Sequence, residues 1–265
     1  MDSKQLDDKR INASPTKEFF IYMLVRDVPL TRAILDLVDN CVDGARRERP
    51  NNDFSGLTVK LTVLPTHFEI SDNCGGIEVE IARSYAFRFG RPRSVAMTSH
   101  SIGQFGVGMK RSIFKIGGNF VVDSTTKNSH FLVSSDIEQW MSESSDEDGT
   151  DWHFQFSQLE KGLETVDPQK IGTRIEITNL HPSIVDSFND AAFLTRLADE
   201  ISVAHAMNMD YGLRIFLNDI ALTHEPQRLF QSDILRPAFV EKTYERQVID
   251  QQDGAPVRVR LYAGV

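Results

Sequence analysis

The close spacing of its strand-like segments limits this chain to a small set of folds. Segments with alternating apolar residues or many β-branched residues occur at 57–64, 67–71, 120–124, 130–134, 152–156, 173–178 and 213–217. Several consecutive segments are separated by too few residues for the helical crossover that parallel pairing requires. Helical patterns at 27–49 and 190–207 supply a second layer. The sequence therefore predicts an α/β sandwich with a mixed or antiparallel sheet.

The size and composition of the chain fit one large core. With 265 residues, of which 40% are hydrophobic, the chain has room for a principal domain of roughly 200 residues and a smaller appendage. No apolar run approaches the roughly 20 residues of a membrane helix, and residues 1–10 are too polar for a secretory signal. We therefore expect a cytoplasmic protein with no membrane partner.

Charge and cysteine content exclude other classes of protein. The net charge of -9 disfavours a chain that coats nucleic acid over its whole surface, because such binding neutralises phosphates with Lys and Arg. A local basic patch stays open. Cys41 and Cys74 lack a paired metal-ligand spacing, so a disulfide scaffold or a zinc site has little support. Both are interpreted as small buried residues.

Three polar residues share one face of the helix predicted at 27–49. Asp36, Asn40 and Asp43 are spaced i, i+4, i+7, which places them in one narrow stripe, and the opposite side is apolar. Two carboxylates flanking an amide suit a hydrated magnesium ion, which prefers oxygen ligands and is commonly shared with substrate phosphates. The alternative interpretation is a surface helix whose acids are merely solvated.

The turn after the strand at 67–71 carries another candidate carboxylate. Asp72 is followed by Asn-Cys-Gly-Gly, and glycine lets the backbone approach a flat ligand closely. An ionised carboxylate only accepts hydrogen bonds, so Asp72 would select a ligand with an amino group, such as the adenine edge. An ordinary Asp-Asn-x-Gly turn is the alternative.

A glycine-rich segment joins an irregular stretch to a predicted helix. Gly103, Gly106 and Gly108 stand where backbone amides and a helix dipole can hold phosphate oxygens. The dinucleotide fold requires a preceding strand that is missing here, and the P-loop sequence is absent. Lys110 or Arg111 would add a phosphate contact, or each is only a charge on the helix surface.

Taken in order, these motifs resemble those of the GHKL ATPase superfamily of gyrase B, heat-shock chaperones, histidine kinases and MutL. The resemblance spans roughly residues 15–220 and includes Gly172-Thr173 at a strand start. Its glycine run is most similar to the heat-shock chaperone, MutL and MORC branches. The resemblance implies a Bergerat-type two-layer sandwich, with a mostly antiparallel sheet covered by helices on one face. It also implies ATP and Mg2+ as cofactors.

The resemblance assigns roles residue by residue. Asp36 would be the general base, Asn40 the magnesium ligand, and Asp43 a support of the pocket. Asp72 would receive the adenine amino group, Thr173 would assist it, and Gly76 would let the nucleotide approach. The nucleotide-binding set is completed by Ile77, Gly103, Gln104, Phe105, Gly106, Val107, Gly108 and Lys110.

Two positions depart from the family pattern. Asp36 stands where the family usually has glutamate and is shorter by one methylene, about 1.5 Å of reach. Because proton abstraction requires an approach of about 2.6 to 3.2 Å, hydrolysis would be slow or water-mediated while binding survives. Cys74 stands where many members have glycine, which narrows the space near the adenine.

The resemblance also predicts a domain plan. It comprises a mobile arm at 1–13, the ATP-binding domain at 14–225 with a lid near 83–110, and a C-terminal extension or the start of a transducer-like domain at 226–265. The leading hypothesis is an ATPase switch in which ATP closes the lid and promotes homodimerisation or docking of a downstream domain or protein client.

Other functions stay open beside the ATPase switch. An ATP-gated binding module with little turnover is supported by Asp36. A protein kinase is disfavoured, because no helical hairpin with a phospho-acceptor histidine lies upstream. Action on DNA would use a cluster of basic residues. The alternative, which is the stronger one, is that these residues contact the phosphates of ATP or only solvent. The cluster comprises Arg83, Arg88, Arg91, Arg93, Lys110, Arg111 and Lys115.

Overall fold

The chain is divided into two compact units, Met1–His224 and Glu225–Val265. The computed structural model describes residues 13, 15–90, 108–142, 152–224, 238–244 and 257–263. The second unit contains an antiparallel hairpin of β9 (Ala238–Tyr244) and β10 (Val257–Ala263), paired from Val257 opposite Tyr244 to Ala263 opposite Ala238. The candidate site residues belong to the first unit.

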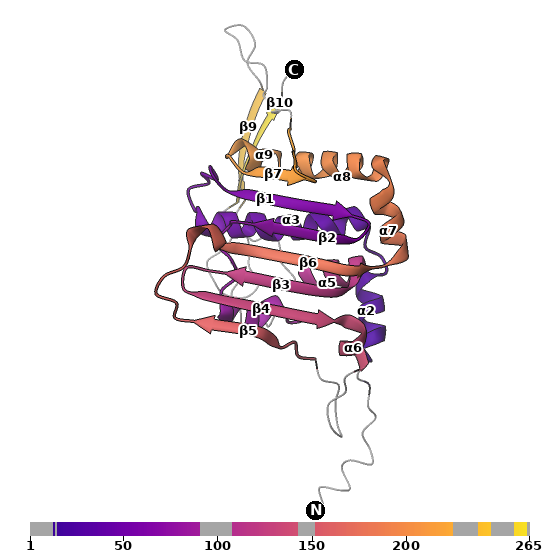
Figure 1. The fold of residues 1–265 in the computed structure, drawn as a ribbon. Helices are drawn as coiled ribbons and strands as arrows, with labels where there is room; N and C mark the ends of the chain where they lie inside the picture. The colour runs from indigo at the N-terminus through magenta and orange to yellow at the C-terminus, as the bar shows by residue number, and fades with distance from the viewer. Residues whose placement is uncertain are drawn as a thin grey trace, which may run out of the picture. The chain divides into compact units, whose positions relative to one another are not determined.

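An eight-stranded sheet forms the frame of the described part of the first unit (Figure 1). The strand order is β5-β4-β3-β6-β2-β1-β7-β8, and neighbouring strands are antiparallel apart from the parallel pair β1 and β7. The predicted mixed, mostly antiparallel sheet is thereby confirmed. The strands are β1 (Thr58–Leu64), β2 (His67–Asp72), β3 (Gly117–Thr125), β4 (Ser129–Asp136), β5 (Phe156–Lys161), β6 (Gly172–Leu180), β7 (Arg214–Leu217) and β8 (Ile220–Ala221).

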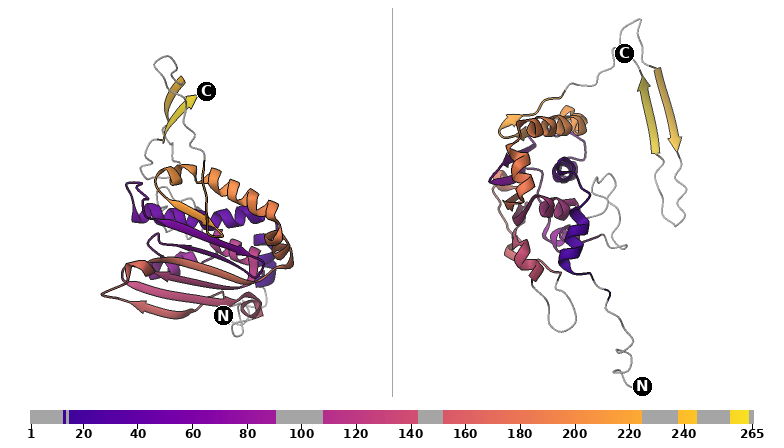
Figure 2. Two further views of the ribbon diagram at one scale, coloured as in Figure 1. Left: turned by 45° about the horizontal axis from the view of Figure 1, so that its top comes forward. Right: turned by 90° about the vertical axis from the view of Figure 1, so that its right-hand side faces the viewer.

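Helices complete the predicted two-layer sandwich. α2, α3 and α5 lie behind the sheet in Figure 1, and the edge-on view in Figure 2 shows them on one side of it. None of the helices that the structure describes combines the length and apolar composition needed to cross a membrane. The helical elements are α2 (Lys17–Val25), α3 (Leu30–Glu48), α4 (Val79–Ile81), η1 (Ala82–Ala86), α5 (Gly108–Ile116), α6 (Ile137–Ser142), η2 (Pro168–Lys170), α7 (Pro182–Asn189), α8 (Ala191–Ala204) and α9 (Ala206–Asp210).

The core forms where apolar strand faces meet the helices. In β1 the buried positions Val59, Leu61 and Val63 alternate with more exposed neighbours, as expected for a strand with one covered face. The helix predicted at 27–49 is confirmed as α3, which turns its apolar side into the same core. This packing fixes α3 against the sheet and so fixes the polar residues that α3 carries.

Two local predictions are wrong for identifiable reasons. The strand predicted at 152–156 is absent, and β5 starts only at Phe156. Trp152 and Phe154 instead pack their rings on Trp140, with centroids 5.9 and 4.7 Å away, so their alternation reflects an aromatic cluster. The helix predicted at 190–207 is interrupted at His205, whose backbone leaves the helical region between α8 and α9.

Candidate functional site

The polar stripe of α3 is buried. Asp36 and Asp43 are only 9% and 8% exposed, and Asn40 between them is partly buried. The neighbouring α5 begins against this stripe, since a Cβ on Gly108 would lie 3.6 Å from Asp36 Oδ2. The alternative of merely solvated acids is therefore wrong, and the stripe needs partners inside the protein or from a ligand.

The Asn40 side chain has an unsatisfied donor. Its Nδ2 atom is buried and has no hydrogen-bond partner. Buried polar groups are nearly always paired, so an orphaned amide indicates a missing ligand or water. In the part of the chain that the structure describes, no three His, Cys, Asp or Glu side chains are grouped to hold a metal. A magnesium ion at Asn40 would therefore take most of its ligands from phosphate and water.

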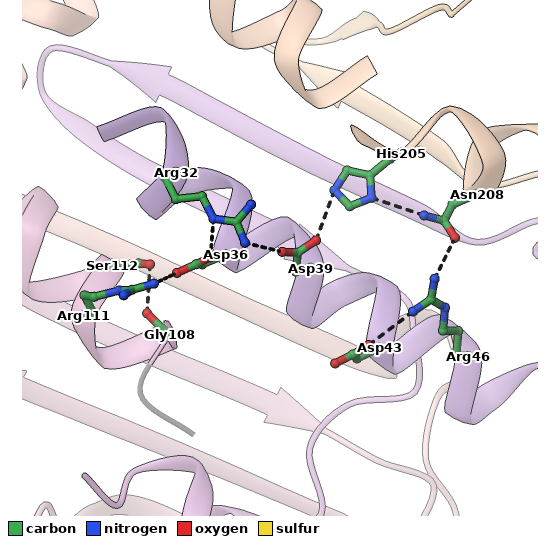
Figure 3. A network of polar contacts seen from close by, with 10 residues as sticks. All are labelled: Arg32, Asp36, Asp39, Asp43, Arg46, Gly108, Arg111, Ser112, His205 and Asn208. Carbon is green, nitrogen blue, oxygen red and sulfur yellow. Dashed lines mark hydrogen bonds and ion pairs between the residues drawn. The ribbon is translucent and has the colours of Figure 1, made fainter. Parts of the chain in front are cut away.

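Asp36 is held by two arginines. Arg32, one turn earlier on α3, places Nε 3.2 Å from Asp36 Oδ1, and Arg111 of α5 donates from Nη2 to Asp36 Oδ2 (Figure 3). Both oxygens of the candidate base thus face guanidinium groups. Arg111 is consequently an ion-pair partner of the candidate base, and the alternative of a plain surface charge is wrong for it.

A second polar network ties the same polar stripe of α3 to His205 and the start of α9. His205 Nε2 lies 3.6 Å from Asp39 Oδ1, and its Nδ1 meets the Asn208 amide at 3.2 Å. Arg46 connects Asn208 back to Asp43, with Nη1 3.7 Å from Asp43 Oδ1 (Figure 3). Together with the arginine pair at Asp36, this network gives each carboxylate of the stripe a partner, whereas Asn40 Nδ2 has none.

The protonation of this network follows from its burial. Desolvation raises the pKa of Asp39 to about 6, with the Arg32 guanidinium opposing the rise. Burial lowers the pKa of His205 to about 4, and the cations Arg46 and Arg32 add to that effect. His205 is therefore neutral at pH 7, and its contact with Asp39 is a polar contact between a carboxylate and an uncharged ring.

The sequence reasoning missed Asp39 and His205. Asp39 extends the stripe at the i+3 spacing from Asp36, which also places residues on one helix face. That spacing was the available signal. No local pattern marks His205 as part of the site, because Asp39, its contact on α3, lies far away in the sequence.

Asp72 lies at the other end of the site, where β2 meets β6. Its Cα pairs with that of Thr173, and its Oδ1 accepts a hydrogen bond of 2.7 Å from the Cys74 N–H. Burial raises the pKa of the Asp72 carboxyl, while hydrogen bonds from Cys74, the Cys41 thiol and the Thr173 backbone oppose the rise. The structure thus brings Asp72 and Thr173 together, with both predicted buried cysteines beside Asp72.

Ser124 organises this end and was not predicted. Its buried hydroxyl accepts a 2.8 Å hydrogen bond from the Ile77 N–H and lies 3.0 Å from the Thr173 hydroxyl. It also donates to the Gly172 carbonyl at 3.3 Å. A single serine of β3 therefore fixes two predicted nucleotide contacts, Ile77 and Thr173, relative to each other.

Gly76 is required by packing within the protein. Its φ is +74°, and a Cβ there would stand 2.2 Å from the Thr125 carbonyl oxygen of β3. No side chain fits at that distance, which real Cβ atoms essentially never show. The glycine thus lets the turn after Asp72 close onto β3, in addition to any role toward a ligand.

The lid and glycine loop are described only at their ends. Gly103, Gln104, Phe105, Gly106 and Val107 lie outside the described residues, as does the stretch 91–102. Gly108 and Lys110 are described, and the Lys110 ammonium donates to the Ala86 carbonyl at 2.7 Å. Lys110 is only 2% exposed, so the alternative of a helix-surface charge is wrong for it, and this burial lowers the pKa of Lys110 to about 7.

Four described members of the basic cluster considered for DNA contact make contacts inside the domain, whereas Arg88 is exposed. Lys115 donates to the Val25 carbonyl at 3.3 Å, and the Arg83 guanidinium lies 5.7 Å from the Phe156 ring centroid. Lys110 and Arg111 face the Ala86 carbonyl and Asp36, as above. Arg91 and Arg93 lie outside the described residues. These contacts give no support to a shared nucleic-acid surface.

Comparison with known proteins gives one family match. A family model described as histidine kinase-, DNA gyrase B- and HSP90-like ATPase matches residues 28–173. The matched segment begins just before α3 and ends at Thr173, so it contains every candidate site residue described above except His205 and Asn208. No curated protein matches the chain.

The packing of Gly76 on β3 predicts an asymmetric effect of two alanine substitutions. Gly56 also has a positive φ, +83°, but a Cβ there would meet no atom within 4 Å. Gly56→Ala should therefore cost only about 1 kcal/mol of backbone strain. Gly76→Ala should cost roughly 1–3 kcal/mol more, because the β3 backbone must move. Urea unfolding of the two variants measures this difference, and equal losses would contradict the packing argument.

Proposed function

Because the chain belongs to the family of histidine kinase-, DNA gyrase B- and HSP90-like ATPases, the GHKL superfamily, we propose that the described site binds Mg·ATP and hydrolyses it slowly. Membership of this family implies ATP binding and suggests ATPase activity in general. The finer proposals concern the metal, the base, the selection of adenine and the consequence of turnover.

The unpartnered Asn40 amide is the observation that carries the proposal. It lies on the buried stripe between Asp36 and Asp43, inside the matched segment, and its unpartnered atom is the donor Nδ2, for which an acceptor such as a phosphate oxygen or a bound water would supply the partner. Asn40 is proposed to hold Mg2+ through its side-chain oxygen, with Asp43 supporting that end. When bound, the magnesium would neutralise charge on the phosphates.

Asp72 and Thr173 are proposed to select adenine. Asp72 keeps one oxygen on the Cys74 N–H, which leaves acceptor capacity for the adenine amino group. The Thr173 hydroxyl is oriented by Ser124 of β3. Gly76 and Ile77 lie in the turn after β2, and both are packed against β3 near Thr173. The phosphate contacts proposed for Gly103 to Gly108 and for Lys110 rest on the family resemblance alone, and of these residues only Gly108 and Lys110 are described.

Asp36 is proposed to act as the general base of hydrolysis. The water oxygen forms a bond to the terminal phosphorus, the bond from that phosphorus to the bridging oxygen breaks, and ADP leaves with the electron pair. The water proton passes to Asp36, directly or through a second water, and then to phosphate or solvent. The short aspartate side chain is the reason why we expect slow turnover.

Turnover is proposed to drive a conformational switch. In this proposal the lid at 83–110 closes on ATP, an ATP-dependent homodimer or a docked partner forms, and hydrolysis resets the state. The domain plan of an arm at 1–13, a nucleotide domain at 14–225 and an extension at 226–265 stays part of the proposal. A cytoplasmic location and a protein client as partner are also proposed.

An ATP-gated binding module with little turnover is the second candidate function. It is favoured by one observation, the engagement of both Asp36 oxygens by Arg32 and Arg111. Each arginine takes one acceptor position of the carboxylate, which leaves fewer positions for the attacking water. The two candidates differ in whether this engagement is released during the ATP cycle.

Replacing Asp36 separates binding from turnover. We expect the parent chain to release ADP from Mg·ATP, and Asp36→Asn to bind ATP at least as tightly with turnover reduced about 100-fold or more, because general-base catalysis contributes about 10²–10⁴. ADP release and bound nucleotide are measured in the same samples. Asp186→Asn, at an exposed position of α7, is the matched control. A parent that binds ATP and releases no ADP would favour the binding module.

Replacing Asn40 tests the metal assignment. Asn40→Ala should remove the effect of Mg2+ on ATP affinity, because the only protein oxygen assigned to the metal is lost. ATP titrations by calorimetry with Mg2+ and with EDTA measure this effect. Asn189→Ala, at the exposed end of α7, should keep the magnesium dependence of the parent. A parent-like dependence in Asn40→Ala would remove Asn40 as the ligand.

Replacing Asp72 tests adenine selection. The parent should prefer ATP to GTP, and Asp72→Asn should lose about tenfold or more in ATP affinity, because an amide donor would face the adenine amino group. The remaining amide oxygen still accepts from Cys74 N–H, so the thermal midpoint should change little. Fluorescence competition with ATP and GTP gives the affinities. Equal affinities for ATP and GTP in the parent would contradict the assignment.

A further inference from the structure

Asp36 is clamped from two elements that differ in freedom. Arg32 belongs to α3 itself, its side chain is 56% exposed, and it also lies 3.7 Å from Asp39 Oδ2. Arg111 belongs to α5, and its side chain is only 28% exposed. Arg111 is therefore the partner that links the candidate base to a second helix (Figure 3).

Arg111 has donor capacity that Asp36 does not use. Its Nε atom is buried and has no hydrogen-bond partner, while Nη2 donates to Asp36 Oδ2. A guanidinium offers its donors in a planar fork that matches the oxygens of phosphate or carboxylate in pairs. A one-point contact with Asp36 leaves part of this fork unsatisfied, and a buried unsatisfied donor is costly.

The position of Arg111 relates this unused donor to the nucleotide. Arg111 follows Gly108 by three residues in the first turn of α5, and Gly108 itself lies against Asp36. A terminal phosphate carries up to about two negative charges, against one for a carboxylate. Since Coulomb attraction grows with charge at a given distance, a phosphate that reaches this turn competes effectively with Asp36 for the guanidinium.

We propose that Arg111 exchanges Asp36 for the terminal phosphate of bound ATP, so that binding of this phosphate frees the carboxylate. Arg111 is then a positioning residue that keeps Asp36 engaged in the nucleotide-free domain and binds the phosphate group that ADP lacks. This inference rests on the proposed function. It reconciles the two candidate functions, because the Arg111 contact with Asp36 Oδ2 ends when ATP is bound, while Arg32 stays on Oδ1.

The ratio of ATP to ADP affinity tests the exchange. With Mg2+ present, Arg111→Gln should weaken ATP binding about tenfold or more, as expected for loss of a charged hydrogen bond, and should change ADP affinity less than about twofold. The matched control is Arg174→Gln, because Arg174 also pairs with two carboxylates, Glu69 and Glu176, but belongs to β6. This control should leave both affinities unchanged.

A second arm tests the competition itself. Asp36→Asn removes the charge that holds Arg111, so it should raise the ATP-to-ADP affinity ratio above that of the parent. Adding Arg111→Gln to Asp36→Asn should abolish this rise. If the contact between Asp36 and Arg111 only held α3 and α5 together, its loss would change stability and would change the affinities for ATP and ADP equally. The ATP-to-ADP affinity ratio would then stay at the parent value in all variants.

The outcomes are distinguishable. If Arg111→Gln weakens ATP binding and ADP binding equally, so that the affinity ratio is unchanged, the exchange is overturned and the proposed function stays intact. A folded parent that binds neither nucleotide overturns both. If thermal unfolding shows that Arg111→Gln does not fold, Arg111→Lys decides, since lysine keeps the charge but not the fork. A reduced ratio in that variant supports the exchange, and the parent ratio overturns it.

Discussion

The packing of α5 against the polar side of α3 is the contact on which the candidate site depends. It buries Asp36 beside Gly108 and supplies Arg111 as its partner. A buried carboxylate is tolerated only when charge and hydrogen bonds compensate its desolvation. The compensation here comes from two helices, so the position of α5 and the state of Asp36 are coupled. A ligand that binds at this junction acts on both.

The sheet provides the second constraint, because it brings together the residues of the Asp72 end of the site. β2 and β6 are neighbours, so Asp72 and Thr173 are opposite each other although a hundred residues separate them in sequence. Ser124 then joins β3 to the same pair. The turn after Asp72 is closed onto β3 by Gly76. The Asp72 end is thus built mainly from backbone geometry, whereas the α3 end is built from side-chain charges.

Local patterns predicted most of the fold and part of the site. Strand alternation and helix periodicity gave α3 and most of the sheet, because covered faces impose apolar repeats. The stripe of Asp36, Asn40 and Asp43 also follows from helix geometry. Arg111 as the partner of Asp36 and His205 beside Asp39 did not follow, since these contacts join distant segments. At Trp152 and Phe154 the same alternation arose from ring packing, so periodicity alone was misleading.

The segment that the family model matches ends inside β6, a strand in the middle of the sheet. The matched segment is therefore shorter than the compact unit that contains it. The match ends at Thr173, yet β6 continues to Leu180 and lies between β3 and β2. A fragment cut at that point would split the sheet into two halves, each with an unpaired inner edge. Such edges are templates for aggregation. A fragment with the boundaries of the family match alone would therefore expose strand edges that the chain keeps paired, whereas the compact unit continues through α9 and β8 to His224.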